Sequence, residues 1–388
     1  MMRYISRLFL FAVAMLVFAG CESHSTTVTP KLDVAENSID VWFDTASYEV
    51  EVKSTHDWVA TTDCDWIVVE TPSGEAGNAA LRLSFESNAE NASREGVVSI
   101  ESSAAQLSAT LIVRQFEKRD EWMQIVYETT DGKEVEINVD NPFNANIVSN
   151  TYSNGEGVIK FDATLTSIGG EAFYGNETLK RVVLPESVTT IGGWAFSSCS
   201  YLLEAGIPKR VKAIGDMAFA YCNQLQEVVI PQSVATIGDS AFCGCSGLKR
   251  IAGKFATADE RCLVINNVLV QFAPKGCTSY VIPDGISTIE HDAFYESLSL
   301  RSVTIPSSVK KIGDCAFYYC ESLKEVYCKS VTPPTLGTAV FDNYDSEGDV
   351  PIGCKIYVPA ESVEAYKSAK NWDRYKGYIN AENTITNK

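Results

Sequence analysis

Residues that commonly carry catalysis are few and far apart in this chain. Its three histidines are His24, His56 and His291; the first falls in an expected tether and the others in two different expected domains. Nucleophilic catalysis needs a serine or cysteine beside an oriented histidine, and the sequence offers no such arrangement. Two carboxylates brought together by a fold can hydrolyse a glycoside, but nothing in the sequence points to such a pair. We therefore expect no catalytic residues, and a glycan-active enzyme is the least favoured alternative.

Short motifs for cofactors and metals are incomplete. Gly155-Glu156-Gly157 is followed by Val-Ile-Lys, so the third glycine of a dinucleotide-binding loop is missing. Cys243 and Cys245 have no second Cys or His pair at zinc spacing. We expect neither a cofactor nor a metal from these motifs. A loop near residue 345 offers hard oxygen ligands without the spacing of an EF-hand, so calcium binding there is left open. Its carboxylates are Asp342, Asp345, Glu347 and Asp349.

Charge and hydrophobicity exclude several classes of protein. The 388 residues include 32 Lys and Arg against 50 Asp and Glu, a formal net charge of −18. A nucleic-acid partner needs a basic stripe for its phosphates, and we expect no such partner. The longest apolar run, residues 8–19, is shorter than the ~20 residues of a membrane-spanning helix. With 45% hydrophobic residues, the chain is long enough to form two or more packed units.

The first residues have the layout of a bacterial export signal. Arg3 and Arg7 precede an apolar stretch, and Phe18-Ala19-Gly20 places small residues before Cys21. This segment resembles a lipoprotein signal, which implies that Cys21 is lipidated and becomes the new N-terminus. We then expect an outer-membrane lipoprotein at the cell surface that meets the membrane only through its lipid, with a flexible tether after it. The alternative is an ordinary cleaved signal peptide with an incidental cysteine.

Residues 31–117 alternate apolar and polar positions in short segments at about ten-residue spacing. This pattern predicts an antiparallel β-sandwich. The order Asp57-Trp58, Asp65-Trp66-Ile67-Val68, Pro72-Ser73-Gly74 and a closing Val113-Arg114-Gln115 resembles a BACON domain. The resemblance implies carbohydrate binding, with mucin glycans as the suggested target, so Trp58 and Trp66 are candidate sugar-stacking residues. The alternatives are that both tryptophans belong to the core and that the domain is a rigid spacer.

From residue 165 onward the chain repeats. Ile168, Ile191, Ile214 and Ile237 are 23 residues apart, and each is followed five residues later by Phe. Apolar offsets within each unit predict a short helix, and the Val-x-Ile that follows predicts a strand. Such units must stack into a solenoid to bury their apolar faces. A column of cysteines belongs to the repeat, so we expect it to be buried and reduced. It comprises Cys199, Cys222, Cys245 and Cys320.

The unit Val-x-x-Ile-Gly-x-x-Ala-Phe-x-x-Cys-x-x-Leu-x-x-Val-x-Ile-Pro, clearest in Val211–Pro231, resembles the BspA-like leucine-rich repeats. We count six good copies and a degenerate one ending at Phe341. The resemblance implies a bacterial envelope protein that attaches to host proteins or glycans. The larger interval from Phe242 to Phe294 indicates an insertion, in which Asn266-Asn267 between apolar segments predicts a β-hairpin.

Aromatic residues stand at positions that do not fit the apolar columns. On a regular scaffold they suit sugar stacking or a protein hot spot; the alternative is that they pack along the flank and bind nothing. These candidate ligand-binding residues are Tyr174, Trp194, Tyr201, Tyr221, Tyr295, Tyr318 and Tyr319. A second candidate is a basic set on the strand face, which marks either an anionic partner or an ordinary solvated face. It comprises Lys249, Arg250, Arg301 and Lys324.

Together these features predict a mainly β protein with short helices, in which an N-terminal immunoglobulin-like β-sandwich precedes a leucine-rich-repeat solenoid. The expected boundaries are 1–20 for the signal peptide, 21–30 for the tether, 31–117 for the sandwich, 118–164 for an N-terminal cap, 165–345 for the repeats with an inserted hairpin near 255–280, and 346–388 for a C-terminal cap. We expect a monomeric, adhesin-like binding protein whose ligand is a host or environmental protein or glycan, such as mucin. The alternative is a structural partner in the assembly of other envelope proteins.

Overall fold

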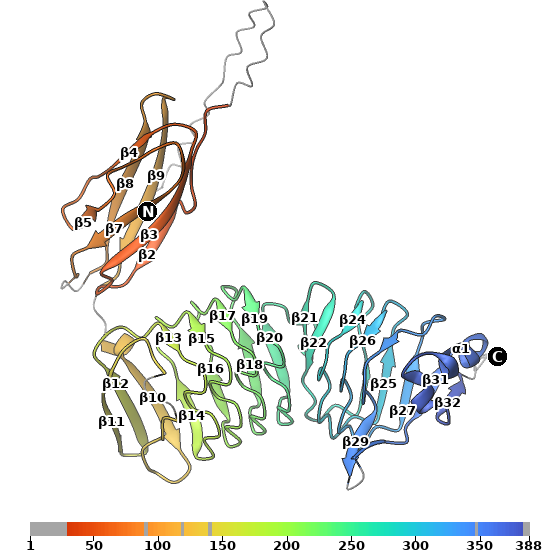
Figure 1. Cartoon of the computed structure of the whole chain (residues 1–388). Coiled ribbons are helices and arrows are strands. Elements are labelled where there is room, and N and C mark those ends of the chain that lie inside the picture. Colours follow the sequence, from red (N-terminus) through yellow and green to blue (C-terminus); the bar gives the residue numbers. More distant parts are fainter. Residues whose placement is uncertain (1–28, 89–91, 118–119, 139–141, 346–347, 383–388) are drawn as a thin grey trace, which may run out of the picture. The chain divides into compact units, whose positions relative to one another are not determined.

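A computed structural model describes residues 29–88, 92–117, 120–138, 142–345 and 348–382. The chain divides into two compact units, 1–118 and 119–388 (Figure 1). Each has its own hydrophobic core. Within the described residues, no helix is long and apolar enough to cross a membrane.

The first unit consists of two β-sheets that enclose one core. One sheet has the strand order β1-β3-β7-β5, and its strands are β1 (Leu32–Val34), β3 (Ser47–Ser54), β7 (Gly77–Phe85) and β5 (Ile67–Val69). The other has the order β2-β9-β8-β4-β6, and its strands are β2 (Ser38–Val41), β9 (Leu107–Gln115), β8 (Arg94–Ser102), β4 (Trp58–Thr62) and β6 (Ser73–Gly74). The expectation of a purely antiparallel sandwich was wrong in one place, because β2 pairs with β9 in parallel.

The second unit is a solenoid whose coils each contribute two strands (Figure 1). Two-residue strands carry the isoleucine column and pair in parallel at the 23-residue offset, as in Ile191↔Ile214. They are β13 (Ser167–Ile168), β15 (Thr190–Ile191), β17 (Ala213–Ile214), β19 (Thr236–Ile237), β24 (Thr288–Ile289), β26 (Lys311–Ile312) and β28 (Thr335–Leu336). Longer strands carry the Val-x-Ile segment on another side of the coil. They are β14 (Leu179–Val183), β16 (Glu204–Gly206), β18 (Glu227–Ile230), β20 (Arg250–Gly253), β23 (Ser279–Val281), β25 (Ser302–Ile305) and β27 (Glu325–Cys328).

The prediction of a short helix in each repeat was wrong. The segment from the glycine to the cysteine is a series of turns in every copy. In each coil the residue before the Ala-Phe pair has a positive φ, as in Trp194 (61°) and Met217 (50°), and so does the second residue after the Phe, as in Tyr221 (59°). A helix cannot continue through left-handed residues. The apolar residues whose spacing resembles a helical face therefore line the inside of a tight turn.

The repeated glycine serves close packing between coils. A Cβ at Gly215 would lie 2.4 Å from the backbone nitrogen of Gly193, and one at Gly192 would lie 2.6 Å from that of Gly170. The glycine is therefore required by this close packing and not by a left-handed backbone. The left-handed position comes two residues later.

Antiparallel strands cover the first coil. The strands β11 (Ile147–Ser153), β12 (Glu156–Phe161) and β10 (Gln124–Thr129) continue into β14 and β16 as one sheet, preceded by the 3-10 helix η1 (Asp120–Met123). Residues 134–138, after the bend at Asp131-Gly132, form no strand, although Val135 is buried. Asn154 and Gly155 form the turn between β11 and β12.

The insertion is a hairpin of β21 (Cys262–Ile265) and β22 (Val268–Phe272). Asn266 and Asn267 both have positive φ, as a tight two-residue turn requires. β22 then pairs in parallel with β24, so the hairpin replaces the turn segment of one coil. The apolar core of the solenoid divides into two clusters here, one before and one after the insertion.

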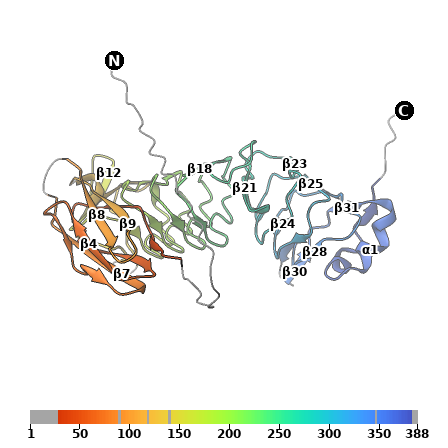
Figure 2. The same cartoon turned by 90° about the horizontal axis from the view of Figure 1, so that it is seen from above.

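The last coil is closed by a small helical cap at the end of the coil row opposite to β12 (Figures 1 and 2). Tyr366 and Trp372 are fully buried, with ring centroids 4.9 Å apart, and Phe341 contacts Trp372. The cap comprises β29 (Asp342–Asp345), β30 (Gly348–Pro351), β31 (Lys355–Val358), η2 (Ala360–Ser362), α1 (Val363–Ser368), η3 (Trp372–Tyr375) and β32 (Ile379–Ala381).

Candidate functional site

Phenylalanine and cysteine columns make the scaffold that positions the surface residues. Phe196 stacks on Phe173 and on Phe219, both at 5.1 Å between ring centroids and within 9° of parallel. The backbone N–H of each of these phenylalanines donates to the alanine carbonyl of the next coil, as from Phe196 to Ala218 at 2.7 Å. Rings and hydrogen bonds in register fix each coil relative to its neighbours.

The cysteine column is buried, and its thiols are free. Each thiol donates to the phenylalanine carbonyl of the preceding coil, as from Cys222 Sγ to Phe196 O at 3.1 Å and from Cys320 Sγ to Phe294 O at 3.2 Å. Burial raises the pKa of Cys199, Cys245 and Cys320 to about 12. Since the thiolate is the reactive form, these residues are packing elements and not a chemical site.

The candidate aromatic residues separate into groups. Tyr174 and Trp194 stand on adjacent coils, 41% and 39% exposed, with their rings edge to face at 5.8 Å. Tyr201 is 47% exposed, but it lies in the loop between Cys199 and β16, in another column. The structure therefore brings Tyr174 and Trp194 together and leaves Tyr201 apart from that pair.

The other four candidates pack mainly on one another. Tyr295 contacts Tyr221, Tyr318 and Tyr319, with ring centroids 5.9 to 6.1 Å apart. Tyr318 was expected to be exposed but is buried, and its hydroxyl donates to Asp349 at 2.6 Å. Burial raises the pKa of Tyr221 to about 12. The positive φ two residues after each Phe turns this segment back on the neighbouring coil, which explains why adjacent tyrosines differ in exposure.

A partly buried polar contact, Ser240–Asp292, lies beside these tyrosines. It connects the coil before the inserted hairpin with the coil after it. Ser240 Oγ donates to Asp292 Oδ2 at 3.0 Å. Both residues occupy the left-handed position of their coils, and they meet because the intervening coil lacks that turn. Burial raises the pKa of Asp292 and of Glu296. Sequence reasoning missed this contact, although the 52-residue interval is the same as that from Phe242 to Phe294.

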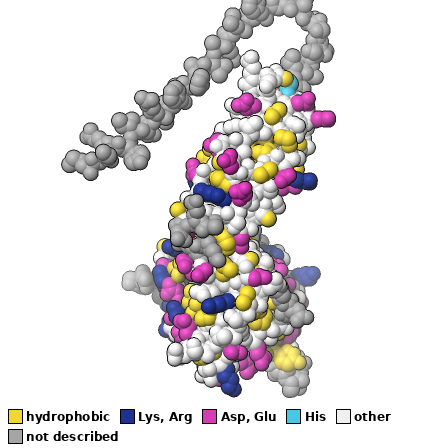
Figure 3. Space-filling model, turned by 90° about the vertical axis from the view of Figure 1, so that its left-hand side faces the viewer, with side chains coloured by type: hydrophobic (Ala, Val, Ile, Leu, Met, Phe, Trp, Pro, Cys, Tyr) yellow, Lys and Arg dark blue, Asp and Glu magenta, His cyan; other side chains and the backbone are white. Residues whose placement is uncertain are grey.

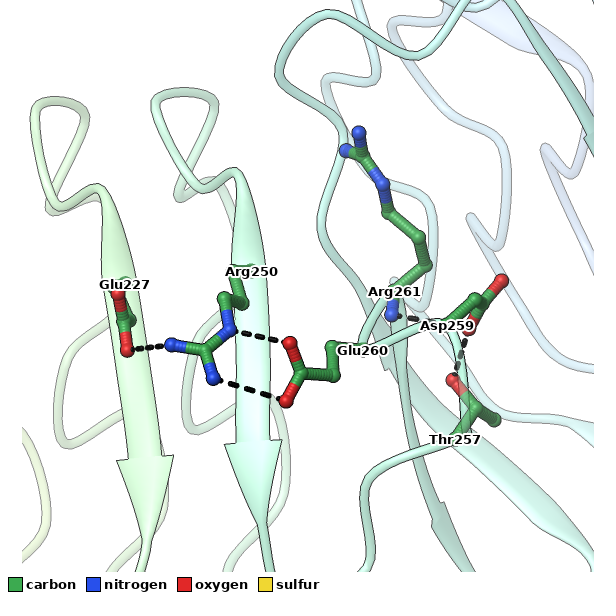
Figure 4. Close-up of polar contacts among 6 residues, drawn as sticks. All are labelled: Glu227, Arg250, Thr257, Asp259, Glu260 and Arg261. Atoms are coloured by element: carbon green, nitrogen blue, oxygen red, sulfur yellow. Dashed lines mark hydrogen bonds and ion pairs between the residues drawn. The ribbon is translucent and has the colours of Figure 1, made fainter.

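The basic set is only partly available to a ligand. Figure 4 shows Arg250 between two carboxylates, with Nη2 donating to Glu260 at 2.9 Å and Nη1 donating to Glu227. The Glu260 carboxylate raises the pKa of Arg250, and the Arg250 guanidinium lowers that of Glu260. The charge of Arg250 is therefore neutralised by Glu227 and Glu260 within the protein. Lys249, Arg301 and Lys324 are exposed.

The acidic loop near residue 345 is largely committed to internal contacts. It forms the β29–β30 hairpin, with Glu347 outside the described residues. Asp342 is buried and lies 2.7 Å from the Arg374 guanidinium, and it accepts from the Tyr375 hydroxyl at 2.8 Å. Within the described residues, no group of three or more His, Cys, Asp or Glu side chains could hold a metal ion.

The two candidate tryptophans of the first unit, Trp58 and Trp66, differ in their surroundings. Trp58 is 1% exposed and packs on Gly74, where a Cβ would lie 2.4 Å from its ring. It belongs to the core and presents no face to a sugar. Trp66 is half-buried, and the Arg94 guanidinium covers its ring at 4.5 Å. Cys21 lies outside the described residues.

The strand face also carries an aromatic pair that sequence reasoning missed. Tyr327 and Tyr357 stack at 5.0 Å on β27 and β31, where the register places them side by side. The Tyr327 hydroxyl donates to Glu325. The sequence could have predicted this pair only if the pairing of β31 with β27 were already known, because that register places the two tyrosines opposite each other.

Stacked coils with fixed columns agree with the comparisons to known proteins. The chain belongs to the BspA-type leucine-rich repeat family, whose model matches residues 146–259 and 270–358 in six copies. The match is interrupted at 260–269, the region of the hairpin. No curated protein matches the chain.

Several solved structures are similar to this chain. A leucine-rich cell surface protein from Faecalibacterium prausnitzii A2-165 is 22% identical over 56% of this chain and 80% of its own, with a TM-score of 0.31. The leucine-rich repeat protein of T. pallidum is 28% identical over 46% of this chain and 70% of its own, with a TM-score of 0.29. One from Bacteroides ovatus ATCC 8483 is 22% identical over 58% and 80%, with a TM-score of 0.28.

Proposed function

We propose that this protein is an exported binding protein whose solenoid recognises a macromolecule, protein or glycan, outside the cell membrane. The observation that carries the proposal is the exposed pair of Tyr174 and Trp194 on adjacent coils. The Trp194 N–H donates to Asp216 O of the next coil at 2.9 Å, and the residues on either side of Tyr174 also donate to the next coil, from Phe173 N–H to Ala195 O and from Gly175 N–H to Ser197 O, both at 2.8 Å. A rigid aromatic pair offers a large contact area at small entropic cost.

Of the seven candidate residues, these two support the proposal best. The four tyrosines around Tyr295 have much of their ring surface against one another, so we assign them to packing. Tyr201 remains a separate candidate because it is exposed. The first unit serves in this proposal as a BACON-like spacer or auxiliary glycan-binding module, with Trp66 as its remaining aromatic candidate.

The test compares binding by the chain from residue 22 with that of the Tyr174→Ala/Trp194→Ala variant on an array of mucin-type glycans and extracellular-matrix proteins. The expected result is loss of binding by about tenfold or more, because two hot-spot aromatic residues each contribute about 1–2 kcal/mol. Tyr344→Ala, at another exposed tyrosine, is the matched control. Unchanged binding by the double variant, with unaltered melting curves, would refute the site. Loss of a co-purifying envelope protein instead would favour a role in assembly.

The proposed anchor is Cys21. Its lipidation would confine the protein to the outer membrane, with contact to the bilayer through acyl chains alone. Cys21→Ala is then expected to move the protein from the detergent phase to the aqueous phase in a phase-partition experiment. Partitioning that does not change would contradict the anchor.

A further inference from the structure

A row of cations follows one column of the solenoid, at the residue directly after the buried leucine that precedes each long strand. Lys249 follows Leu248, Arg301 follows Leu300 and Lys324 follows Leu323. The N–H of Lys324 donates to the carbonyl of Arg301 at 2.8 Å. Lys275, in the inserted coil, joins the row because its N–H donates to the Leu248 carbonyl at 2.8 Å. Arg301 and Lys324 precede the paired strands β25 and β27, and paired strands are about 4.8 Å apart, so these two charges follow one another closely. Thr278 stands between Lys249 and Arg301 in this column, because the Arg301 N–H donates to the Thr278 carbonyl at 2.8 Å.

Among the described residues the four cations have no carboxylate partner, unlike Lys180 and Arg181 in earlier coils. Lys180 lies 3.2 Å from Glu128, and Arg181 lies 3.3 Å from Glu204. Carboxylates next to the row bind other groups. Glu227 and Glu260 bind Arg250 (Figure 4), and Glu325, directly after Lys324, accepts from the Tyr327 hydroxyl at 3.0 Å. Acidic side chains are otherwise spread over the protein surface, as on the face shown in Figure 3. A cationic row in a chain of net charge −18 is a local reversal of sign.

The row begins at a hollow of about 280 Å³, close to the lower limit of about 300 Å³ for ligand pockets. Asn223, Gln224, Gln226, Lys249 and Lys275 line it together with Leu203, and Lys249 Nζ donates to Gln226 Oε1 at 3.0 Å. No side chain fits at Gly247 on its wall, since a Cβ there would lie 2.4 Å from the Asn223 carbonyl oxygen. Amides donate and accept hydrogen bonds, which suits sugar hydroxyls, and the cations suit carboxylate or sulfate groups.

We propose that the hollow and the row form a second binding surface, for a linear polysaccharide that carries carboxylate or sulfate groups. One sugar residue occupies the hollow, and the chain continues along Arg301 and Lys324 with its anionic groups facing the cations. The surface lies in a different column from Tyr174 and Trp194, so its function is independent of the one proposed for that pair. An extended acidic peptide would gain from the charges alone and would leave the amides without hydroxyl partners.

The experiment measures binding of the chain from residue 22 to polygalacturonate, to chondroitin sulfate and to poly-glutamate, at low and at physiological ionic strength. The test variant changes Lys249, Lys275, Arg301 and Lys324 to Gln. The control variant makes the same change of charge at exposed lysines in other columns, namely Lys133, Lys310, Lys311 and Lys370.

We expect at least one of the two polysaccharides to bind, and the row variant to bind it about tenfold more weakly, because four exposed charge pairs each contribute a few tenths of a kcal/mol. The control variant and Tyr174→Ala/Trp194→Ala should bind as the unaltered chain does. Preference for polygalacturonate assigns the ligand to carboxylated chains, and preference for chondroitin sulfate to sulfated ones. Binding by neither polymer, or equal losses in the row and control variants, would overturn the proposal. Binding of poly-glutamate as tightly as either polysaccharide would overturn the assignment to a glycan.

Discussion

Asp292 shows how one side chain can join two parts of the solenoid. It has a positive φ of 57° and accepts a hydrogen bond from Ser240, a residue 52 positions earlier. Desolvation of its carboxylate is the main cause of its raised pKa, and the nearby Asp314 carboxylate adds to it. A folded-state pKa above the unfolded one contributes stability at low pH, and that contribution is lost as pH rises through the folded pKa.

Asp292→Asn should therefore stabilise the protein at neutral pH and have little effect near pH 4. Asparagine tolerates the left-handed backbone and can still accept from Ser240, so the variant removes mainly the charge. Thermal melting of both proteins between about pH 4 and 7 measures the difference, which should grow with pH to a few degrees. Asp239→Asn, at an exposed carboxylate of the preceding coil, is the control. A lower melting temperature of the variant at pH 7 would contradict this prediction and show that the ionised carboxylate stabilises the contact with Ser240.

Thiol labelling tests the cysteine column. In the native protein, Cys199, Cys222, Cys245 and Cys320 should resist alkylation, because they are buried and the pKa of each is raised. The half-buried cysteines, Cys64, Cys277 and Cys315, should react before the column does, and unfolding in denaturant should make all of these residues reactive. Mass spectrometry of labelled peptides identifies each site. Rapid labelling of the column in native protein would contradict the stacked coils.

At the scale of the coil, stability depends on how closely one turn approaches the next. Gly215 lies against the backbone of the preceding coil, so a side chain there has no room. Gly206, on the outer face of β16, would accept a Cβ with no atom within 4 Å. The two glycines therefore have different roles, although both belong to the same 23-residue pattern.

Gly215→Ala should lower the free energy of unfolding by about 1–3 kcal/mol, the typical cost of forced overpacking. Gly206→Ala is the matched control and should be neutral or slightly stabilising, since alanine loses less backbone entropy than glycine on folding. Urea unfolding followed by circular dichroism gives both values. Equal effects of the two substitutions would contradict the coil-to-coil packing described here.

The sequence predicts the stacking of the coils better than their internal path. Columns of Ile, Phe and Cys at fixed intervals predict the solenoid because each repeat must bury its apolar face against its neighbours. The apolar offsets do not distinguish a helix from a tight turn, and left-handed residues such as Trp194, Met217 and Asp292 have no sequence signal of the kind that glycine gives. The exposure of Tyr174 but not of Tyr318 depends on the β29–β30 hairpin, which no repeat position predicts.

At the scale of the whole molecule, the chain consists of two units with separate cores. The solenoid carries the exposed aromatic pair and the cationic row, and the sandwich buries one of its two candidate tryptophans. If the proposed function holds, ligand recognition belongs to residues 118–388, and the solenoid alone should bind as the longer chain does.

The measurement is binding of residues 22–388, and separately of residues 118–388, to the same array of mucin-type glycans and extracellular-matrix proteins. Our account predicts that both bind the same ligand with affinities within about a factor of three, since additivity holds for independent sites. Binding by the longer chain alone, with the shorter one folded, would contradict it and assign recognition to the sandwich or the junction.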